Sequence, residues 1–226
     1  MLIEIPALLS AAQVEDARAA LNGATWTDGR GTAGYLSARV KDNQQLAEDD
    51  PVARRLGGMI LDVLDRHQTF IAAALPLKVL PPLFNRYAGG HAYGAHVDGA
   101  VRPAPGTPHR VRTDVSATLF LSDPATYDGG ELIVEDAFGP RSVKLAAGSM
   151  VLYPGTSVHS VAPVTRGARL AAFFWVQSMV RDDAQRAILF DLDRSIQELA
   201  RAGEESPAMT RLAGVYHNLL RRWGDV

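Results

Sequence analysis

The sequence contains no cysteine among its 226 residues. Disulfides, thiolate metal sites and cysteine nucleophiles are therefore excluded, and a protein metal site would have to use His, Asp or Glu, a ligand set that suits iron, manganese, zinc or copper. The sequence also lacks an excess of basic residues, because its formal net charge is −2. Composition therefore gives no support for a nucleic-acid partner.

Long hydrophobic runs and a signal peptide are missing as well. No apolar run approaches the ~20 residues that are needed to span a bilayer. The first residues, MLIEIPALLSAAQ, carry an acidic residue early and no basic segment of the kind that opens a signal peptide. We therefore expect a cytoplasmic protein with no membrane partner. Its oligomeric state is left open.

Helical periodicity is present at both ends of the chain. Hydrophobic residues make up 47% and charged residues 21% of the sequence, which is typical of a globular chain. Ser10 and Pro51 are suitable residues for helix N-termini. Apolar residues at helical spacing predict helices over residues 11–22, 51–74, about 181–202 and, after a break at 203–207, to about 223.

Short strands separated by turns fill the middle of the chain. The apolar runs predict strands over residues 77–87, 92–97, 113–121, 130–135, 141–145, 149–154, 157–163 and 168–178. Their close spacing indicates a barrel or a sandwich. Residues 24–49 give mixed signals and are read as short strands or loops. The Pro-rich stretch 102–108 is read as a solvated loop, with a mobile lid over the substrate as the alternative.

Three side chains are spaced as a metal site requires. His96 and Asp98 lie two residues apart, so that both point to the same side of an extended chain. His159 follows the turn YPGTSV at the start of a strand, and Arg169 lies ten residues further on. Two histidines and one carboxylate form the facial triad of non-heme iron oxygenases, which leaves open coordination positions. A nearby arginine can bind a dicarboxylate through two parallel hydrogen bonds.

These motifs resemble the prolyl 4-hydroxylase-like branch of the Fe(II)/2-oxoglutarate dioxygenases. The resemblance is carried by Arg86-Tyr87, His96-x-Asp98, the run TLFL at 118–121, DGGEL at 128–132, Gly148, His159 and Arg169. The longer runs YDGGEL, VLYPGTSVHSVAPVTRGARLAAFFWVQSMVRD and LFDLD are similar to the bacterial PKHD-type hydroxylases of that branch. The resemblance extends from about residue 77 to at least residue 195.

The resemblance implies an α+β fold with a double-stranded β-helix, or jelly-roll, core. The core would occupy residues 77–180 and form the catalytic unit. Helices and strands in residues 1–76 would support it, and residues 181–226 would form a C-terminal helical segment.

The resemblance also implies the chemistry. His96, Asp98 and His159 would bind Fe(II), and Arg169 would bind the distal carboxylate of 2-oxoglutarate. The enzyme would use O2 to hydroxylate a protein or peptide side chain, or a small molecule, while 2-oxoglutarate is decarboxylated to succinate. L-ascorbate is a candidate accessory cofactor. Collagen-type prolyl hydroxylases carry lysine at the Arg169 position, so the chain agrees there with the bacterial members.

Several roles stay open. Tyr87 is either a core tyrosine or a contact to the cosubstrate, and Tyr93 and Gln177 are further candidate donors. Arg166 is a rival to Arg169, although Arg166-Gly167 has the composition of a turn. Trp175 shares a strand face with Arg169 by period two and is read mainly as a packing residue.

The alternative function is a cupin-like metal-binding protein without dioxygenase activity. Arg169 argues against this alternative, because such a protein needs no clamp for a dicarboxylate.

Overall fold

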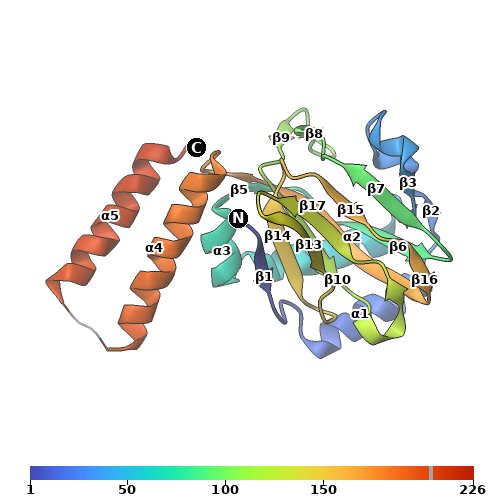
Figure 1. The fold of residues 1–226 in the computed structure, drawn as a ribbon, viewed down its shortest axis with the longest axis horizontal. Helices are drawn as coiled ribbons and strands as arrows, with labels where there is room; N and C mark the ends of the chain where they lie inside the picture. The colour runs from blue at the N-terminus through green and yellow to red at the C-terminus, as the bar shows by residue number, and fades with distance from the viewer. Residues whose placement is uncertain (204–205) are drawn as a thin grey trace.

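The computed structural model describes residues 1–203 and 206–226, which form a strand-rich body and a pair of C-terminal helices (Figure 1). Over the described residues, the α-helices are α1 (Ala11–Asn22), α2 (Pro51–Leu64), α3 (Gln68–Ala74), α4 (Asp183–Arg201) and α5 (Pro207–Trp223). In the part of the chain that is described, no helix is both long enough and apolar enough to cross a membrane.

Two antiparallel sheets build the body. The larger sheet has the order β1-β14-β10-β17-β6-β4-β2, with β5 also paired to β17, and the smaller sheet has the order β13-β12-β15-β7-β3. The strands of the larger sheet are Ile3–Ile5 (β1), Thr27–Asp28 (β2), Gln44–Gln45 (β4), Pro76–Val79 (β5), Leu83–Ala88 (β6), Val115–Phe120 (β10), Met150–Pro154 (β14) and Ala168–Ser178 (β17). Those of the smaller sheet are Lys41–Asp42 (β3), Ala92–His96 (β7), Leu132–Asp136 (β12), Gly139–Val143 (β13) and His159–Val161 (β15).

Two strand pairs lie outside these sheets. They are β8 (Val101–Pro103) with β9 (Arg110–Arg112), and β11 (Asp128–Gly129) with β16 (Val164–Arg166). Together the sheets confirm the predicted α+β fold with a double-stranded β-helix core.

The central strand β17 shows how the sequence positions the core and the site. Its residues alternate between two faces of the larger sheet, as side chains of a strand must. Leu170, Ala172 and Phe174 join the hydrophobic core that contains residues of α1 and α2. Arg169 and Trp175 point to the opposite face, where they line a pocket between the sheets. One strand therefore supplies both the main core and the wall of the pocket.

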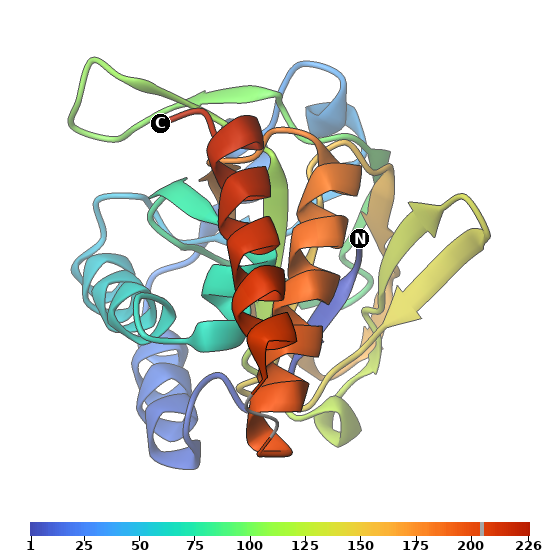
Figure 2. The same cartoon turned by 90° about the vertical axis from the view of Figure 1, so that its left-hand side faces the viewer.

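The C-terminal helices pack side by side across one end of the body (Figure 2). Leu75, Val180 and Leu189 form a small buried cluster, against which partly buried side chains of α5 pack. Arg186 of α4 is buried, and its guanidinium donates to the carbonyl oxygens of Val180 and Arg181 at 2.8 and 2.7 Å. These contacts attach α4 to the end of β17.

Two sequence predictions of regular structure were wrong in detail. The helix expected over residues 51–74 is two helices, because α2 ends at Leu64 and His67 caps α3 by accepting a hydrogen bond from the Phe70 amide. The strand expected over residues 77–87 is also two strands, since Pro81 and Pro82 separate β5 from β6 and lack the amide hydrogen that a ladder requires. Both breaks have a local signal that the prediction did not use, because residues 65–69 are all polar and residues 81 and 82 are both proline.

The loop expected over residues 102–108 is confirmed for 104–108, which contain no strand and are largely exposed. Residues 102 and 103 belong instead to β8 of the β8–β9 hairpin, and Arg102 lines the pocket. The break expected at residues 203–207 includes residues 204 and 205, which lie outside the described residues. The helices expected at 11–22 and the strand at 168–178 are confirmed with the predicted bounds.

Gly129 gives a test of the backbone at the turn before β12. Its φ is +74°, and a Cβ there would lie 1.9 Å from the carbonyl oxygen of Pro163. Gly129→Ala should therefore lower the free energy of unfolding by clearly more than the ~1–2 kcal/mol of a left-handed backbone alone. Gly89→Ala is the matched control, because φ is +62° there and no atom lies within 4 Å of the added Cβ. Equal losses in chemical denaturation would contradict the close approach.

Candidate active site

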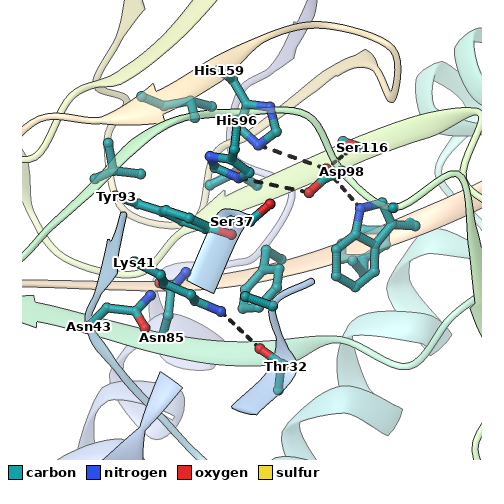
Figure 3. Close-up of a pocket in the computed structure, with 18 of the residues that line it drawn as sticks. Thr32, Ser37, Lys41, Asn43, Asn85, Tyr93, His96, Asp98, Ser116 and His159 are labelled. Carbon is teal, nitrogen blue, oxygen red and sulfur yellow. Dashed lines mark hydrogen bonds and ion pairs between the residues drawn. The ribbon is translucent and has the colours of Figure 1, made fainter. Parts of the chain in front are cut away.

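His96, Asp98 and His159 meet at one end of the smaller sheet. His96 ends β7 and His159 begins β15, and the two residues are paired in register. The His96 Nε2 lies 4.0 Å from Asp98 Oδ1, and the His159 Nε2 lies 3.8 Å from Asp98 Oδ2 (Figure 3). One candidate ligand atom from each residue lies within 4.8 Å of the others. The structure thus brings together the three residues that the sequence singled out.

Backbone contacts fix both imidazole rings. The Nδ1 of His96 lies 2.8 Å from the carbonyl oxygen of Gly94, and the Nδ1 of His159 lies 3.1 Å from that of Ser157. A carbonyl oxygen only accepts, so Nδ1 is the protonated nitrogen of each ring and Nε2 keeps a lone pair toward the centre. Burial and the neighbouring His159 lower the pKa of His96 to about 4. This ring is therefore neutral at physiological pH, as a metal ligand must be.

The carboxylate of Asp98 is held by two donors. Ser116 Oγ and Trp175 Nε1 donate to Oδ2 at 2.7 and 2.9 Å. Trp175 was expected to face the pocket but was read as a packing residue, so its hydrogen bond was missed. The period-two pattern of β17 was the available signal. It places the ring on the correct face but does not show what the indole nitrogen meets.

Aromatic rings support the two histidines. Tyr93 stacks on His96 with ring centroids 3.6 Å apart and an interplanar angle of 15°. Tyr153 meets His159 edge to face at 5.1 Å. Burial raises the pKa of both tyrosines, and so does the charge of Asp98. These rings exclude water from the histidines and restrict their orientation.

Arg169 lies deeper in the same pocket and lacks a partner for its charge. It is 1% exposed, and its Nε and Nη1 atoms are buried without a hydrogen-bond partner among the described residues. The rings of Tyr87 and Phe120 lie 5.4 and 5.1 Å from its guanidinium carbon. A buried, unpaired cation is costly unless a ligand satisfies it. The arrangement fits the carboxylate of a small ligand.

Tyr87 is placed both as a core tyrosine and as a residue of the pocket, the two roles that the sequence left open. It pairs in register with Arg169 and belongs to a buried cluster, yet it also lines the pocket. Burial is the main cause that raises its pKa to about 12, against the lowering effect of Arg169. Tyr87 is therefore a protonated side chain beside the unpaired guanidinium.

The other candidates lie elsewhere. Arg166 is exposed and forms an ion pair with Asp128, with Nε 2.7 Å from Oδ2, which removes it as a rival to Arg169. Gln177 accepts a hydrogen bond from the amide of Arg112 at 3.2 Å and is not among the described residues that line the pocket. Of the three candidate donors, Tyr87 and Tyr93 line it.

A polar wall completes the pocket, which encloses about 700 Å³ including its mouth. Lys41, Asn43, Gln45, Asn85 and Arg102 form this wall. Sequence reasoning missed all of them. The first three come from residues 24–49, whose strands β3 and β4 are two residues long and show no periodicity.

Two family models match this chain. The 2OG-Fe(II) oxygenase superfamily model matches residues 82–177, and the PKHD-type hydroxylase C-terminal domain model matches residues 183–225. The second match covers the pair of C-terminal helices. A PKHD-type hydroxylase from Parvibaculum lavamentivorans is 60% identical over 225 residues, which cover 100% of each chain.

Two solved structures are similar in fold. A prolyl hydroxylase from Trichoplax adhaerens, in complex with a hypoxia inducible factor peptide fragment, has a TM-score of 0.56 and 16% identity, covering 83% of this chain and 86% of that one. HygX from Streptomyces hygroscopicus, with nickel, 2-oxoglutarate and hygromycin B bound, has a TM-score of 0.54 and 18% identity, covering 78% and 82%. At these identities the likeness supports the fold alone.

Identity of 60% over the full length is a much stronger relation than these likenesses in fold. It agrees with a site that combines two histidines, a carboxylate and an unpaired arginine. A metal-binding protein without a cosubstrate would not require that arginine. The chain belongs to the PKHD-type hydroxylases of the 2OG-Fe(II) oxygenase superfamily and is an Fe(II)- and 2-oxoglutarate-dependent dioxygenase.

Proposed function

We propose that His96, Asp98 and His159 are the Fe(II) ligands of this enzyme. The observation that carries the proposal is the convergence of their three ligand atoms within 4.8 Å beside a buried, unpaired arginine. Both histidines direct Nε2 to the centre, and a set of two histidines and one carboxylate suits iron. Bound Fe(II) would supply the dioxygen chemistry that no amino-acid side chain provides.

Arg169 is proposed to bind the distal carboxylate of 2-oxoglutarate. The Nε and Nη1 atoms have no partner among the described residues, so the guanidinium has free donors for that carboxylate. The protonated hydroxyl of Tyr87 lies beside it as a further donor. Phe120 and Tyr87 exclude water from the ion pair, which strengthens it.

The proposed substrate is a protein or peptide side chain, or a small molecule, which enters from the pocket mouth near Arg102. One neighbour in fold was solved with a peptide and another with hygromycin B, so this fold accommodates both kinds of ligand. The division into a supporting segment at 1–76, a catalytic core at 77–180 and a helical segment at 181–226 is part of the proposal. A cytoplasmic location is proposed because Fe(II) and 2-oxoglutarate are available in that compartment, and L-ascorbate would serve to keep iron reduced.

His159→Ala tests the metal ligands. The variant should lose bound Fe(II) and with it the formation of succinate from 2-oxoglutarate, because one of three ligands is gone. Iron content after anaerobic loading is the primary readout, and His217→Ala on the exposed face of α5 is the control. Normal iron content and turnover in His159→Ala would remove His159 from the site.

Arg169→Met tests the cosubstrate clamp. Loss of a buried, charge-assisted pair should raise the 2-oxoglutarate concentration needed for half-maximal succinate release by roughly 100-fold. Iron affinity should stay close to that of the natural protein. Arg166→Met is the matched control, since its guanidinium is engaged by Asp128 on the surface. A larger effect in Arg166→Met would exchange the two roles.

Trp175→Phe tests the hydrogen bond that orients Asp98. The variant keeps an aromatic ring in the wall but removes the Nε1–H donor, so Fe(II) or Mn(II) affinity should fall roughly 10- to 100-fold. Calorimetric metal titration measures the change, and Trp223→Phe in α5 controls for the general effect of replacing tryptophan. Unchanged affinity would reduce Trp175 to a packing residue.

A further inference from the structure

Lys41 is a buried cation that the proposed iron and cosubstrate roles do not use. Its side chain is 4% exposed, and its ammonium donates to Thr32 Oγ1 at 2.8 Å (Figure 3). The ammonium nitrogen lies 5.3 Å from the ring centroid of Tyr93 and 5.9 Å from that of Phe173. Within the described part of the chain it forms no ion pair. Such burial is costly, and groups that lower stability concentrate at functional sites.

Arg102 is a second cation on the same pocket. It projects from the β8–β9 hairpin, and its guanidinium carbon lies 4.1 Å from the ring centroid of Trp175. Trp175 in turn meets Phe173 edge to face at 5.5 Å. Lys41 over Phe173 and Arg102 over Trp175 thus flank one aromatic wall. Burial is the main cause that lowers the pKa of Lys41 to about 8, and repulsion by the positive charge of Arg102 is the second.

The charges of the pocket do not balance without a further anion. Asp98 is the one acidic residue among the described residues that line it, while Lys41, Arg102 and Arg169 are basic. Fe(II) with doubly charged 2-oxoglutarate adds no net charge, and Asp98 offsets Arg169. Asp98 attracts both Lys41 and Arg102, and Asp28 attracts Lys41 and Glu48 attracts Arg102 less strongly. Among the described residues, no ion pair joins Lys41 or Arg102 to any of these carboxylates. Two positive charges, those of Lys41 and Arg102, remain in the pocket.

We infer that the substrate of this enzyme carries a carboxylate, which binds between Lys41 and Arg102. The inference rests on the proposed function, since it takes iron and 2-oxoglutarate to occupy the triad and Arg169. Lys41 lies beside Phe173 and Arg102 beside Trp175, the two rings contact each other, and Trp175 also donates to the proposed ligand Asp98. The anchored carboxylate therefore holds the rest of the substrate next to the metal.

Buried amides beside Lys41 indicate a second feature of the substrate. Asn43, Gln45 and Asn85 are 3%, 2% and 7% exposed and line the same pocket. Both amide atoms of Asn43, Nε2 of Gln45 and Oδ1 of Asn85 have no partner among the described residues. Native structures rarely leave such groups unsatisfied, and a ligand that both donates and accepts would satisfy them. A carboxylate next to an amide, as in an N-acylated amino acid or an acidic peptide, has this chemistry.

A matched pair of probes tests the subsite. Hippurate presents a carboxylate beside an amide, and hippuramide has the same shape without the charge. Both are titrated by calorimetry into protein loaded with Mn(II) and 2-oxoglutarate. Hippurate should bind at least tenfold more tightly than hippuramide. Lys41→Met and Arg102→Met should each weaken hippurate binding at least tenfold, whereas Arg110→Met, on the exposed side of the same hairpin, should not.

Equal binding of the two probes, or hippurate binding that is unchanged in Lys41→Met and Arg102→Met, would overturn the subsite. Lys41→Met should also raise the melting temperature of the free protein, because it removes an uncompensated buried charge; a lower one would count against the inference. If Mn(II) and 2-oxoglutarate fail to bind, the proposed function fails. The titration is then repeated on metal-free Arg169→Met protein, where hippurate binding that depends on Lys41 and Arg102 upholds the subsite and its absence overturns it.

Discussion

The register between β7 and β15 is the constraint on which the site depends. It sets His96 opposite His159, and the carbonyl oxygens of Gly94 and Ser157 accept from Nδ1 of the two rings, so that both rings direct Nε2 to the centre. A slip of one residue would move the side chains of a strand to the other face of the sheet. Both histidines could then no longer reach Asp98. The pairing therefore fixes the positions of the two histidines more tightly than a loop could, because the strands are rigid elements of a two-sheet core.

Unsatisfied polar groups distinguish the inside of this barrel from an ordinary core. Arg169, Lys41 and three amide side chains are buried with atoms or charges that the described chain does not satisfy. In a folded protein such groups lower stability unless a ligand completes them. The hydrophobic cluster on the other face of the larger sheet offsets that loss. β17 joins the two, since its alternate residues belong to the core and to the pocket.

The sequence predicted those parts of the site that local spacing controls. The two-residue interval between His96 and Asp98, and the shared face of Arg169 and Trp175, follow from the period of a strand. The strand over 168–178 is long enough for its pattern to be read without ambiguity. The resemblance to bacterial PKHD-type hydroxylases supplied the roles, which spacing alone leaves open.

Long-range pairing controls the rest and leaves no such pattern. Lys41 reaches the pocket because β3 pairs with β7, and Gln45 because β4 pairs with β6, over separations of about fifty and forty residues. Strands of two residues carry no readable period. The hydrogen bond from Trp175 to Asp98 likewise depends on how distant strands meet. The break between α2 and α3, by contrast, has a local signal, because residues 65–69 between Leu64 and Phe70 are all polar.

The central claim is that the triad and Arg169 bind Fe(II) and 2-oxoglutarate at one centre. Its most direct test is anaerobic loading with Fe(II), then addition of 2-oxoglutarate, followed by visible absorption and by succinate release when air is admitted. A weak metal-to-ligand charge-transfer band that requires both components, with succinate formed afterwards, is the expected result. Protein that binds iron but gives neither the band nor succinate would contradict the claim.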